Sequence, residues 1–393
     1  MRVHRTLPPA AAPLRWADLR HGVAGIFSSA RSLRAREEEI RRHFGVRHVF
    51  LVSSGTAALT LTLSALKSRS ARTSVVIPAY TCFSVAAAVV KAGLQPVLCD
   101  IDPGTFDFDH ALLARTLTPD TLCVVTHHLF GIPSDVGRLR ALCQARGVAV
   151  VEDAAQAMGA ELDGRALGTL GDVGIFSLGR GKNITCGAGG IIVTDCPRTA
   201  ATIARYYRRL PAPSARGVLK ELARLVVMTA FIRPRLYWLP TALPFLRLGQ
   251  TVYPRDIAIA RLSGMQAGLL RGWQGRLARS NRTRAETATD LSRRLRRPLP
   301  HGSRPYLRLP LLAATPAERD RMVARSQERG LGLSVAYPTP INEIPDLRAV
   351  FNGARFPSAR RVADSLLTLP THHWLSEADK RAIVALCQEG RAA

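Results

Sequence analysis

The amino-acid sequence predicts an α/β protein with a mainly parallel central sheet and a smaller α+β domain at the C-terminus. One observation is that short apolar runs of strand character alternate with helix-like stretches over residues 1–270. Another is size, because 393 residues with 47% hydrophobic content can bury a large core and form more than one domain. We therefore expect a large domain over residues 1–270 and a small domain over residues 271–393.

The strands are predicted at short apolar runs bounded by polar or small residues. They lie at residues 50–52, 74–77, 96–101, 122–126, 148–151, 175–176 and 191–193. A helix-like, arginine-rich stretch follows at 266–297. The prolines at 298 and 300 then make a hinge candidate before the small domain.

The first predicted strand turns through Ser54, Gly55 and Thr56 into a helix with apolar residues at helical spacing. The unpaired amides of a first helical turn, with nearby hydroxyls and the helix dipole, favour a bound phosphate. Taken alone, the turn is better interpreted as an ordinary Ser/Thr helix cap. Because it matches neither the Walker pattern nor the dinucleotide glycine fingerprint, it argues against a P-loop or Rossmann enzyme.

Asp153 stands at the end of the predicted strand 148–151, where α/β proteins keep their sites. Such an acid can hold a protonated ring nitrogen or a metal, or it can cap the following helix. No histidine or cysteine stands nearby at metal-ligand spacing, so a metal is the weakest of the three interpretations and we predict none.

Lys182 lies in a glycine-rich turn between two apolar strands. Glycines allow positive-φ turns and the close approach of a bulky group. A partly desolvated amine also loses its proton more easily and becomes a nucleophile. The alternative is a hairpin whose lysine is merely solvated. The glycines lie at positions 179, 181, 187, 189 and 190.

The phosphate turn, the strand-end acid and the lysine together suit pyridoxal phosphate. This cofactor needs an amine to bind its aldehyde covalently, a carboxylate to keep its pyridine nitrogen protonated, and donors for its phosphate. The lysine lies 29 residues beyond the acid (182 minus 153).

Several motifs follow one another along the chain. They include Ser54-Gly-Thr-Ala-Ala-Leu, Pro78-Ala-Tyr-Thr-Cys-Phe-Ser, His128-Leu-Phe-Gly, Glu152-Asp-Ala-Ala-Gln, Phe176-Ser, Lys182-Asn and Arg261-Leu-Ser-Gly-Met-Gln. In this order they closely resemble the DegT/DnrJ/StrS family, most of whose members are aminotransferases acting on nucleotide-linked ketosugars. The resemblance implies a three-layer, fold-type-I pyridoxal-phosphate transferase and covers most of the chain.

The same resemblance implies a role for individual residues. Lys182 would carry the cofactor and then move the proton between cofactor and substrate carbons. Asp153 would pair with the ring nitrogen, and Gln156 would lie near the ring's phenolic oxygen. The phosphate would be bound by Gly55, Thr56, Ala57 and Ser177, and the substrate would contact Tyr80 and His128.

The chain departs from the family pattern at three positions. Cys82 stands where many members place an aromatic residue that stacks on the cofactor ring. Ile259 replaces an asparagine that reaches the partner subunit's phosphate, and we hypothesise that Arg180 supplies the missing phosphate charge. Asn342 stands where a histidine is common, so no substrate contact is carried over from that loop.

The segment 205–252 is an apolar, basic insertion, and the chain as a whole carries a net charge of +26. Residues 225–246 are interrupted by Arg-Pro-Arg at 233–235, so they cannot form a single transmembrane helix. We expect this stretch either to pack at a dimer interface or to contact an anionic membrane surface. Nucleic acid is not expected as a partner, because the arginines are scattered and not interleaved with aromatic residues.

The chain has seven cysteines without a close Cys-x-x-Cys pair, and its N-terminus has no apolar signal region. These features predict a reducing, cytoplasmic location. With the resemblance, they indicate a homodimeric transaminase that takes its amino group from glutamate and serves polysaccharide or secondary-metabolite biosynthesis. Two alternatives stay open: a pyridoxamine-dependent sugar dehydratase, whose relatives usually carry histidine in place of Lys182, and a non-catalytic, basic membrane-associated protein.

Overall fold

The computed structural model describes residues 5–12, 14–243 and 251–389. Its centre is a seven-stranded sheet in the order β1-β9-β8-β5-β4-β2-β3. Only β9 runs antiparallel to its neighbours within this sheet, so the predicted mainly parallel sheet is confirmed. The strands are β1 (His48–Val52), β2 (Ser74–Pro78), β3 (Gln95–Cys99), β4 (Thr121–His127), β5 (Ala149–Asp153), β8 (Val173–Ser177) and β9 (Gly190–Thr194).

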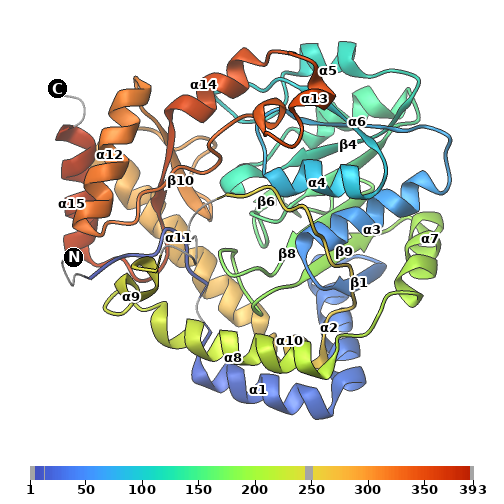
Figure 1. Cartoon of the computed structure of the whole chain (residues 1–393), viewed down its shortest axis with the longest axis horizontal. Helices are drawn as coiled ribbons and strands as arrows, with labels where there is room; N and C mark the ends of the chain where they lie inside the picture. Colours follow the sequence, from blue (N-terminus) through green and yellow to red (C-terminus); the bar gives the residue numbers. More distant parts are fainter. Residues whose placement is uncertain (1–4, 13, 244–250, 390–393) are drawn as a thin grey trace.

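Alternate residues of these strands enter two separate hydrophobic cores, because successive side chains of a strand point to opposite faces. One core, shared with α3 (Gly55–Lys67) and α4 (Phe83–Lys91), contains Val52, Val75, Val125, Val151 and Ile192. The other, shared with α2 (Ser29–Phe44), α5 (His110–Thr116) and α6 (Val136–Gln144), contains their sequence neighbours Leu51, Val76, Val124, Val150 and Ile191. The predicted three-layer α/β/α arrangement is therefore confirmed (Figure 1).

The C-terminal region contains the two-stranded antiparallel sheet β10 (Arg308–Leu312) and β11 (Leu366–Pro370). Its helices are α11 (Trp273–Leu295), α12 (Pro316–Arg329), α13 (Arg348–Phe351), α14 (Pro357–Ser365) and α15 (Glu377–Glu389). The helix-like stretch predicted at 266–297 is two helices, α10 (Gly264–Leu269) and α11, because Gly272 adopts a positive φ of 68° between them.

Residues 5–12 pack against the C-terminal region although they begin the chain. The backbone N–H of Leu7 donates to the carbonyl of Gly330 at 2.8 Å. The buried guanidinium of Arg284 donates to the carbonyls of Ala11 and Leu307, both at 2.7 Å. The predicted domain boundary at residue 270 did not anticipate that the N-terminal residues contact the C-terminal region. The boundary itself stays a prediction.

The insertion at 205–252 contains α8 (Ala215–Phe231) and the short α9 (Trp238–Thr241), and it follows α7 (Pro197–Arg208). Helix α8 lies along α1 (Trp16–Phe27) at the lower edge of the molecule (Figure 1). Residues 244–250 of the insertion lie outside the described residues. In the parts of the chain that are described, no helix has the length and apolar character needed to cross a membrane.

Helices α1 and α10 cross at glycines, and the fit is tight. A Cβ atom added at Gly25 would overlap the carbonyl oxygen of Gly264, and one added at Gly268 would overlap the carbonyl oxygen of His21. Because the obstructing atoms are backbone, a side chain at either position forces the two helices apart.

Replacing Gly25 by alanine is expected to lower the free energy of unfolding by about 1–3 kcal/mol, the usual cost of overpacking. The matched control is Gly275→Ala in α11, where the added methyl meets only the end of the Arg279 side chain at 3.7 Å. That variant should be neutral or gain up to ~1 kcal/mol from helix propensity. Urea unfolding measures both, and equal effects of the two substitutions would contradict the close crossing.

Candidate active site

One cavity of about 210 Å³ lies where the C-terminal ends of several parallel strands meet. Its lining includes residues that follow β1, β2 and β4, and residues that end β5 and β8. Parallel strands bring their carboxyl ends to one edge of a sheet, which is why residues far apart in sequence meet here. The predicted site residues that line the cavity are Gly55, Thr56, Cys82, His128, Asp153, Gln156, Ser177 and Lys182.

The turn before α3 combines a helix cap with an open helix start. Ser54 is the cap, and its hydroxyl accepts a hydrogen bond from the N–H of Ala57 at 3.0 Å. A Cβ atom at Gly55 would lie 2.9 Å from Cβ and 3.1 Å from Oγ of Ser177. Only glycine at position 55 therefore lets the Ser177 hydroxyl come up to the amides of the first turn, and an anion fits there.

Asp153 ends β5 and is half-buried in the cavity wall. Its Oδ1 accepts a hydrogen bond from the N–H of Ala155 at 3.0 Å, which fixes the orientation of the carboxylate. Within the described part of the chain its Oδ2 accepts no hydrogen bond, so one oxygen is available to a bound group.

Lys182 reaches the same cavity from the loop 178–189, which joins β8 to β9. The loop is closed by hydrogen bonds from the N–H of Leu178 to the carbonyl of Gly189 at 2.8 Å and from the N–H of Lys182 to the carbonyl of Gly179 at 3.2 Å. The Lys182 amine donates to no group among the described residues. The half-buried Lys182 amine and the Asp153 carboxylate thus line one cavity. Among the described residues, neither the amine nitrogen nor the Oδ2 atom of the carboxylate has a hydrogen-bond partner.

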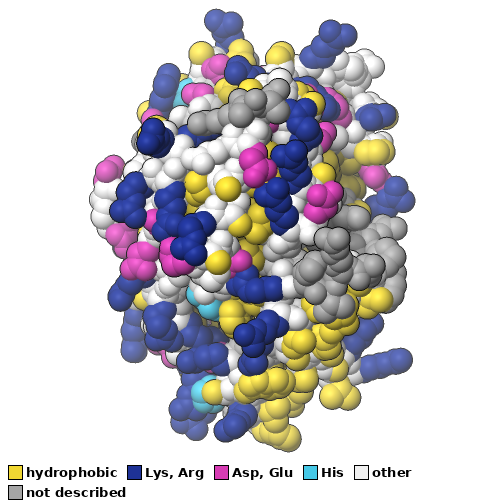
Figure 2. Space-filling view, turned by 90° about the vertical axis from the view of Figure 1, so that its left-hand side faces the viewer, with side chains coloured by type: hydrophobic (Ala, Val, Ile, Leu, Met, Phe, Trp, Pro, Cys, Tyr) yellow, Lys and Arg dark blue, Asp and Glu magenta, His cyan; other side chains and the backbone are white. Residues whose placement is uncertain are grey.

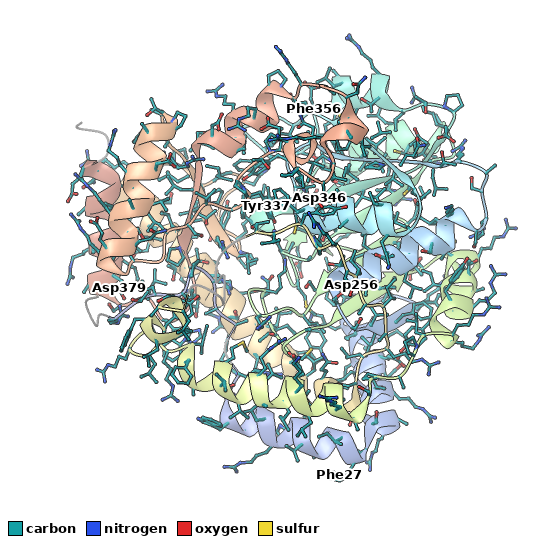
Figure 3. The ribbon with its side chains drawn as sticks, in the orientation of Figure 1. Phe27, Asp256, Tyr337, Asp346, Phe356 and Asp379 are labelled. Carbon is teal, nitrogen blue, oxygen red and sulfur yellow. The ribbon has the colours of Figure 1, made fainter. Side chains whose placement is uncertain are left out.

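Tyr337 also lines the cavity, and it comes from the C-terminal region (Figure 3). Its hydroxyl accepts a hydrogen bond from Nε2 of Gln156 at 2.7 Å, while Oε1 of Gln156 accepts one from the N–H of Phe130 at 3.1 Å. Burial raises the pKa of Tyr337 well above its usual value. The phenol therefore keeps its proton, and no described residue accepts it.

Tyr80, for which a substrate contact is predicted, does not line the cavity. It is fully buried, and its hydroxyl bridges the backbone of Tyr337, donating to the carbonyl at 3.3 Å and accepting from the N–H at 3.4 Å. The two rings pack edge to face with centroids 5.6 Å apart. The structure therefore makes Tyr80 a positioning residue for Tyr337.

His128 lines the cavity, but both of its ring nitrogens are used inside the protein. Nε2 donates to Glu152 at 2.8 Å, and Nδ1 accepts from the N–H of Ser134 at 3.2 Å. Its side chain is also fully buried, so these bonds hold the ring in place inside the protein, and the predicted substrate contact stays a prediction. Glu152 in turn accepts from the backbone amides of Gly168, Leu170 and Gly171.

Two other predicted residues, Ala57 and Arg180, do not line the cavity. Ala57 is fully buried and is not part of the cavity lining. Its backbone N–H donates to the hydroxyl of Ser54. The side chain of Arg180 is exposed, and the structure does not bring it together with the cavity lining. Asn342, for which no substrate contact is carried over, donates to the carbonyl of Ala354 at 2.8 Å and does not line the cavity either.

Cys82 lies in the lining, with its sulfur 2.9 Å from Oγ of Ser84. The neighbouring aromatic residue, Phe83, points into the core, where its ring centroid lies 6.3 Å from that of Tyr337. The structure thus shows an aromatic cluster behind the cavity. The sequence prediction did not include Thr81, His127 or Tyr337 among the lining residues.

Removing the hydroxyl of Tyr337 with a phenylalanine tests its contribution. The loss of one buried hydrogen bond to Gln156 is expected to weaken cofactor binding to the apoenzyme by roughly 2- to 10-fold, because such a bond contributes about 0.5–1.5 kcal/mol. Fluorescence titration with pyridoxal phosphate measures this. The control is Tyr253→Phe, since the hydroxyl of Tyr253 bonds to no described residue, and an equal effect in both variants would speak against a cavity role.

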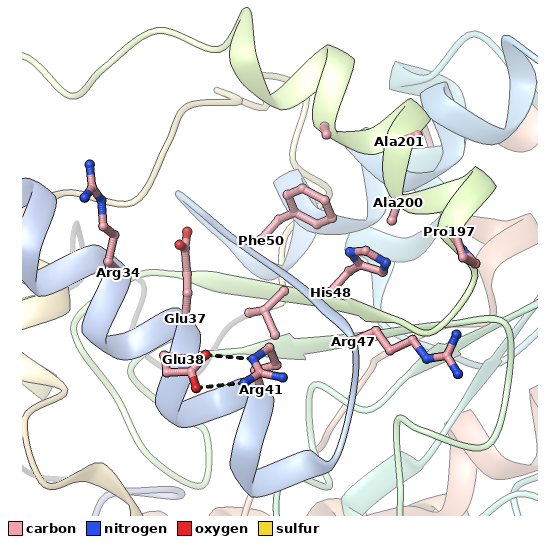
Figure 4. Close-up of a pocket in the computed structure, with 12 residues that line it drawn as sticks. Arg34, Glu37, Glu38, Arg41, Arg47, His48, Phe50, Pro197, Ala200 and Ala201 are labelled. Carbon is pink, nitrogen blue, oxygen red and sulfur yellow. Dashed lines mark hydrogen bonds and ion pairs between the residues drawn. The ribbon is translucent and has the colours of Figure 1, made fainter.

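A larger groove of about 640 Å³ lies elsewhere, between α2, α7 and the start of β1 (Figure 4). Two of its charged side chains bind each other: Glu38 accepts from Nε and Nη2 of Arg41 at 2.7 and 2.8 Å. It contains none of the predicted site residues. Chemistry, and not size, therefore identifies the smaller cavity as the candidate active site.

Comparisons with known proteins bear on this assignment. A model of the DegT/DnrJ/EryC1/StrS aminotransferase family matches residues 23–219 and 247–388. A dTDP-4-dehydro-2,3,6-trideoxy-D-glucose 4-aminotransferase from Saccharopolyspora spinosa is 30% identical over 89% of this chain and 86% of its own. A UDP-N-acetyl-3-dehydro-alpha-D-glucosamine 3-aminotransferase from Acidithiobacillus ferrooxidans is 36% identical, but the match covers 47% of this chain and 51% of that protein. The chain thus spans about half the length of several curated relatives it matches.

Solved structures share the fold over nearly the whole chain. The aminotransferase TlmJ from Streptoalloteichus hindustanus has a TM-score of 0.78 and 26% identity, with 98% of this chain and 99% of that chain covered. Helicobacter pylori PseC, an aminotransferase of pseudaminic acid biosynthesis, also has a TM-score of 0.78, at 19% identity, over 98% and 99% of the two chains. The resemblance seen in the motifs is confirmed: this chain belongs to the DegT/DnrJ/EryC1/StrS aminotransferase family.

Proposed function

We propose that the protein is an aminotransferase that moves an amino group from an amino acid, glutamate in the first instance, to the ketone of a nucleotide-linked sugar. The observation that carries the proposal is the meeting of Lys182, Asp153 and the turn 54–56 in one cavity. Membership of the family makes pyridoxal phosphate the cofactor. The cavity offers each group that this cofactor requires, namely an amine, a carboxylate and a helix start for its phosphate.

Each residue then has a distinct task. Bound pyridoxal phosphate supplies an aldehyde and a ring that stabilises negative charge on the adjacent carbon. Lys182 would hold the cofactor aldehyde through Nζ and would also carry the proton to and from the donor carbon. Asp153 would keep a proton on the ring nitrogen. The first-turn amides at 55 and 56 and the Ser177 hydroxyl would bind the phosphate, and Gln156 would orient the ring.

The class of acceptor is supported by the relatives, two of which act by name on dTDP- and UDP-linked ketosugars. Another relative, 34% identical over 53% of this chain, is a glutamine:2-deoxy-scyllo-inosose aminotransferase from Streptomyces kanamyceticus. Its name gives glutamine as an alternative amino donor and, as the acceptor, a ketone that is not linked to a nucleotide. The basic surface of this chain favours the nucleotide-linked class, because it attracts a diphosphate.

A two-stage assay tests the proposal. The purified holoenzyme is given glutamate or glutamine, and the loss of the visible cofactor band and the release of the keto acid are followed. Acceptors are then added one at a time: a dTDP-4-ketosugar, a UDP-3-ketosugar and scyllo-inosose derivatives. Return of the band with an aminated product supports the function. Consumption of a sugar without amination would favour the dehydratase, and a colourless protein that takes up no cofactor would favour the non-catalytic alternative.

Assembly and location are further parts of the proposal. We propose a homodimer, because the resemblance places Ile259 in the segment by which family members reach the partner subunit's phosphate, although isoleucine here replaces their asparagine. We also propose a cytoplasmic enzyme that serves polysaccharide or secondary-metabolite biosynthesis. Contact between the segment 225–246 and a membrane surface also stays a proposal, and residues 244–246 of that segment are not described. Analytical ultracentrifugation decides the oligomeric state.

A further inference from the structure

Helix α8 carries two apolar faces, and only one of them is covered. Residues spaced as one helical stripe pack toward the core: Val218, Leu222, Leu225 and Thr229. A second stripe lies beside the first and contains Leu219, Ala223, Val226, Val227 and Ala230. Leu219 is 67% exposed and Val227 is 56% exposed. A helix on the surface of a globular protein normally has one apolar stripe, so the second needs a partner.

Helix α1 adds to this surface. Its buried side, which includes Leu19, Gly22 and Gly25, packs on α10. Its other apolar residues face outward: Trp16, Val23, Ile26 and Phe27. Phe27 is 87% exposed and stands at the lower edge of the molecule (Figure 3). Together with exposed leucines of the insertion at 236, 239 and 243, these residues form what we call the α1–α8 face.

The α1–α8 face is bordered by positive charge. Five exposed basic residues of its two helices and the following loop make no ion pair with any residue that the structure describes: Arg20, Arg216, Lys220, Arg233 and Arg235. The single acid of α8, Glu221, is paired with Arg224 at 3.3 Å. Figure 2 shows hydrophobic side chains gathered at the lower end of the molecule, with Lys and Arg side chains around them.

Part of this face lies outside the residues that the family model matches. The family model leaves out residues 220–246, which hold most of α8, and it begins at residue 23, inside α1. Val226, Val227 and the leucines at 236, 239 and 243 therefore belong to what this chain adds to the family model, whereas Val23, Ile26, Phe27 and Leu219 fall inside it. None of these residues lines the catalytic cavity.

We propose that the α1–α8 face docks on a membrane surface that contains anionic lipid. Apolar and aromatic side chains with a rim of unpaired cations, on helices that lie side by side, are the features that hold a protein in the headgroup region. No described helix can span the bilayer, so the contact is peripheral. A second copy of the chain is a poorer occupant, because two faces with the same unpaired positive charge repel each other.

Vesicle co-sedimentation of the full-length holoenzyme tests the proposal. The probes are phosphatidylcholine vesicles with and without phosphatidylglycerol, at low and high salt. The wild-type protein should pellet with the anionic vesicles and be released by salt. The double variant Phe27→Glu/Val227→Glu should bind them roughly tenfold more weakly or worse, because it buries charge in place of two apolar side chains.

The matched control is Val350→Glu on α13, where the valine is 55% exposed and belongs to neither helix of the face. It introduces the same charge and should bind vesicles like the wild type. Retained transaminase turnover and an unchanged thermal midpoint show that a variant is folded, independently of lipid binding.

Three outcomes would overturn the proposal. The wild type fails to pellet with anionic vesicles, or the control loses binding as much as the double variant does. Alternatively, the wild type ignores lipid while the double variant changes sedimentation from dimer to monomer, which would assign the face to a second copy of the chain. A failure of the aminotransferase assay affects none of these readings, since vesicle binding is measured without substrate.

Discussion

Lys182→Ala is expected to lose transaminase turnover by roughly 10³-fold or more, because one substitution removes both the covalent attachment of the cofactor and the group that moves the proton, an acid–base effect of about 10²–10⁴ by itself. The amine lines the cavity and donates to no described residue, so the fold should survive its removal. The visible absorption band of the lysine-bound cofactor should disappear, while non-covalent uptake of cofactor into the turn 54–56 should remain detectable.

The companion variants are Lys182→Arg, which keeps the charge but cannot form the bond, and Lys91→Ala, which removes an exposed lysine at the end of α4. The first should be as inactive as the alanine variant, and the second should match the wild type. Turnover is measured as keto-acid release from glutamate. A Lys182→Ala protein that keeps its band and its turnover would end the assignment of this lysine.

Asp153→Asn should lower turnover by roughly 10²- to 10³-fold, the usual effect of removing one placed charge from a reacting centre. Asparagine keeps the oxygen that accepts from the Ala155 amide, so the local turn should stay intact. What is lost is the negative charge that keeps a proton on the ring nitrogen of the bound cofactor. The cofactor spectrum should therefore change while the thermal midpoint does not.

Asp109→Asn is the control for a pure capping role. Asp109 caps α5 by accepting from the amides of Ala111 and Leu112 at 2.9 and 3.0 Å, and it does not line the cavity. Because asparagine caps about as well as aspartate, both variants should keep their stability. If Asp153 acted only as a cap, neither variant would lose much turnover. A large, selective loss of turnover at Asp153 separates the two interpretations that the sequence left open.

Most of the sheet was predictable, because buried parallel strands are continuous apolar runs and their ends carry the polar residues. Asp153 and Ser177 end their strands where expected, and Lys182 lies in the predicted glycine-rich turn. The short-range pattern was sufficient here, since each residue is placed by the strand beside it.

The sequence does not reveal contacts between distant segments. Tyr80 and Tyr337 are 257 residues apart, and no local pattern shows that the hydroxyl of one holds the backbone of the other. His128 looks like a free ligand in sequence because its partners, Glu152 and the Ser134 amide, are supplied by other segments. The single helix expected at 266–297 failed for a local reason, the positive φ of Gly272.

Gly187 is the point at which the catalytic loop contacts helix α8. It lies in the loop that carries Lys182, and a Cβ atom there would come within 2.7 Å of the buried side chain of Leu225 on α8. Helix α8, most of which lies outside the family model, thus packs against the catalytic loop on one side and forms part of the surface on the other. Deleting α8 to make a smaller enzyme would remove the side chain that packs against this loop. The outward stripe of α8 can therefore change freely in sequence, whereas the helix itself has to be kept.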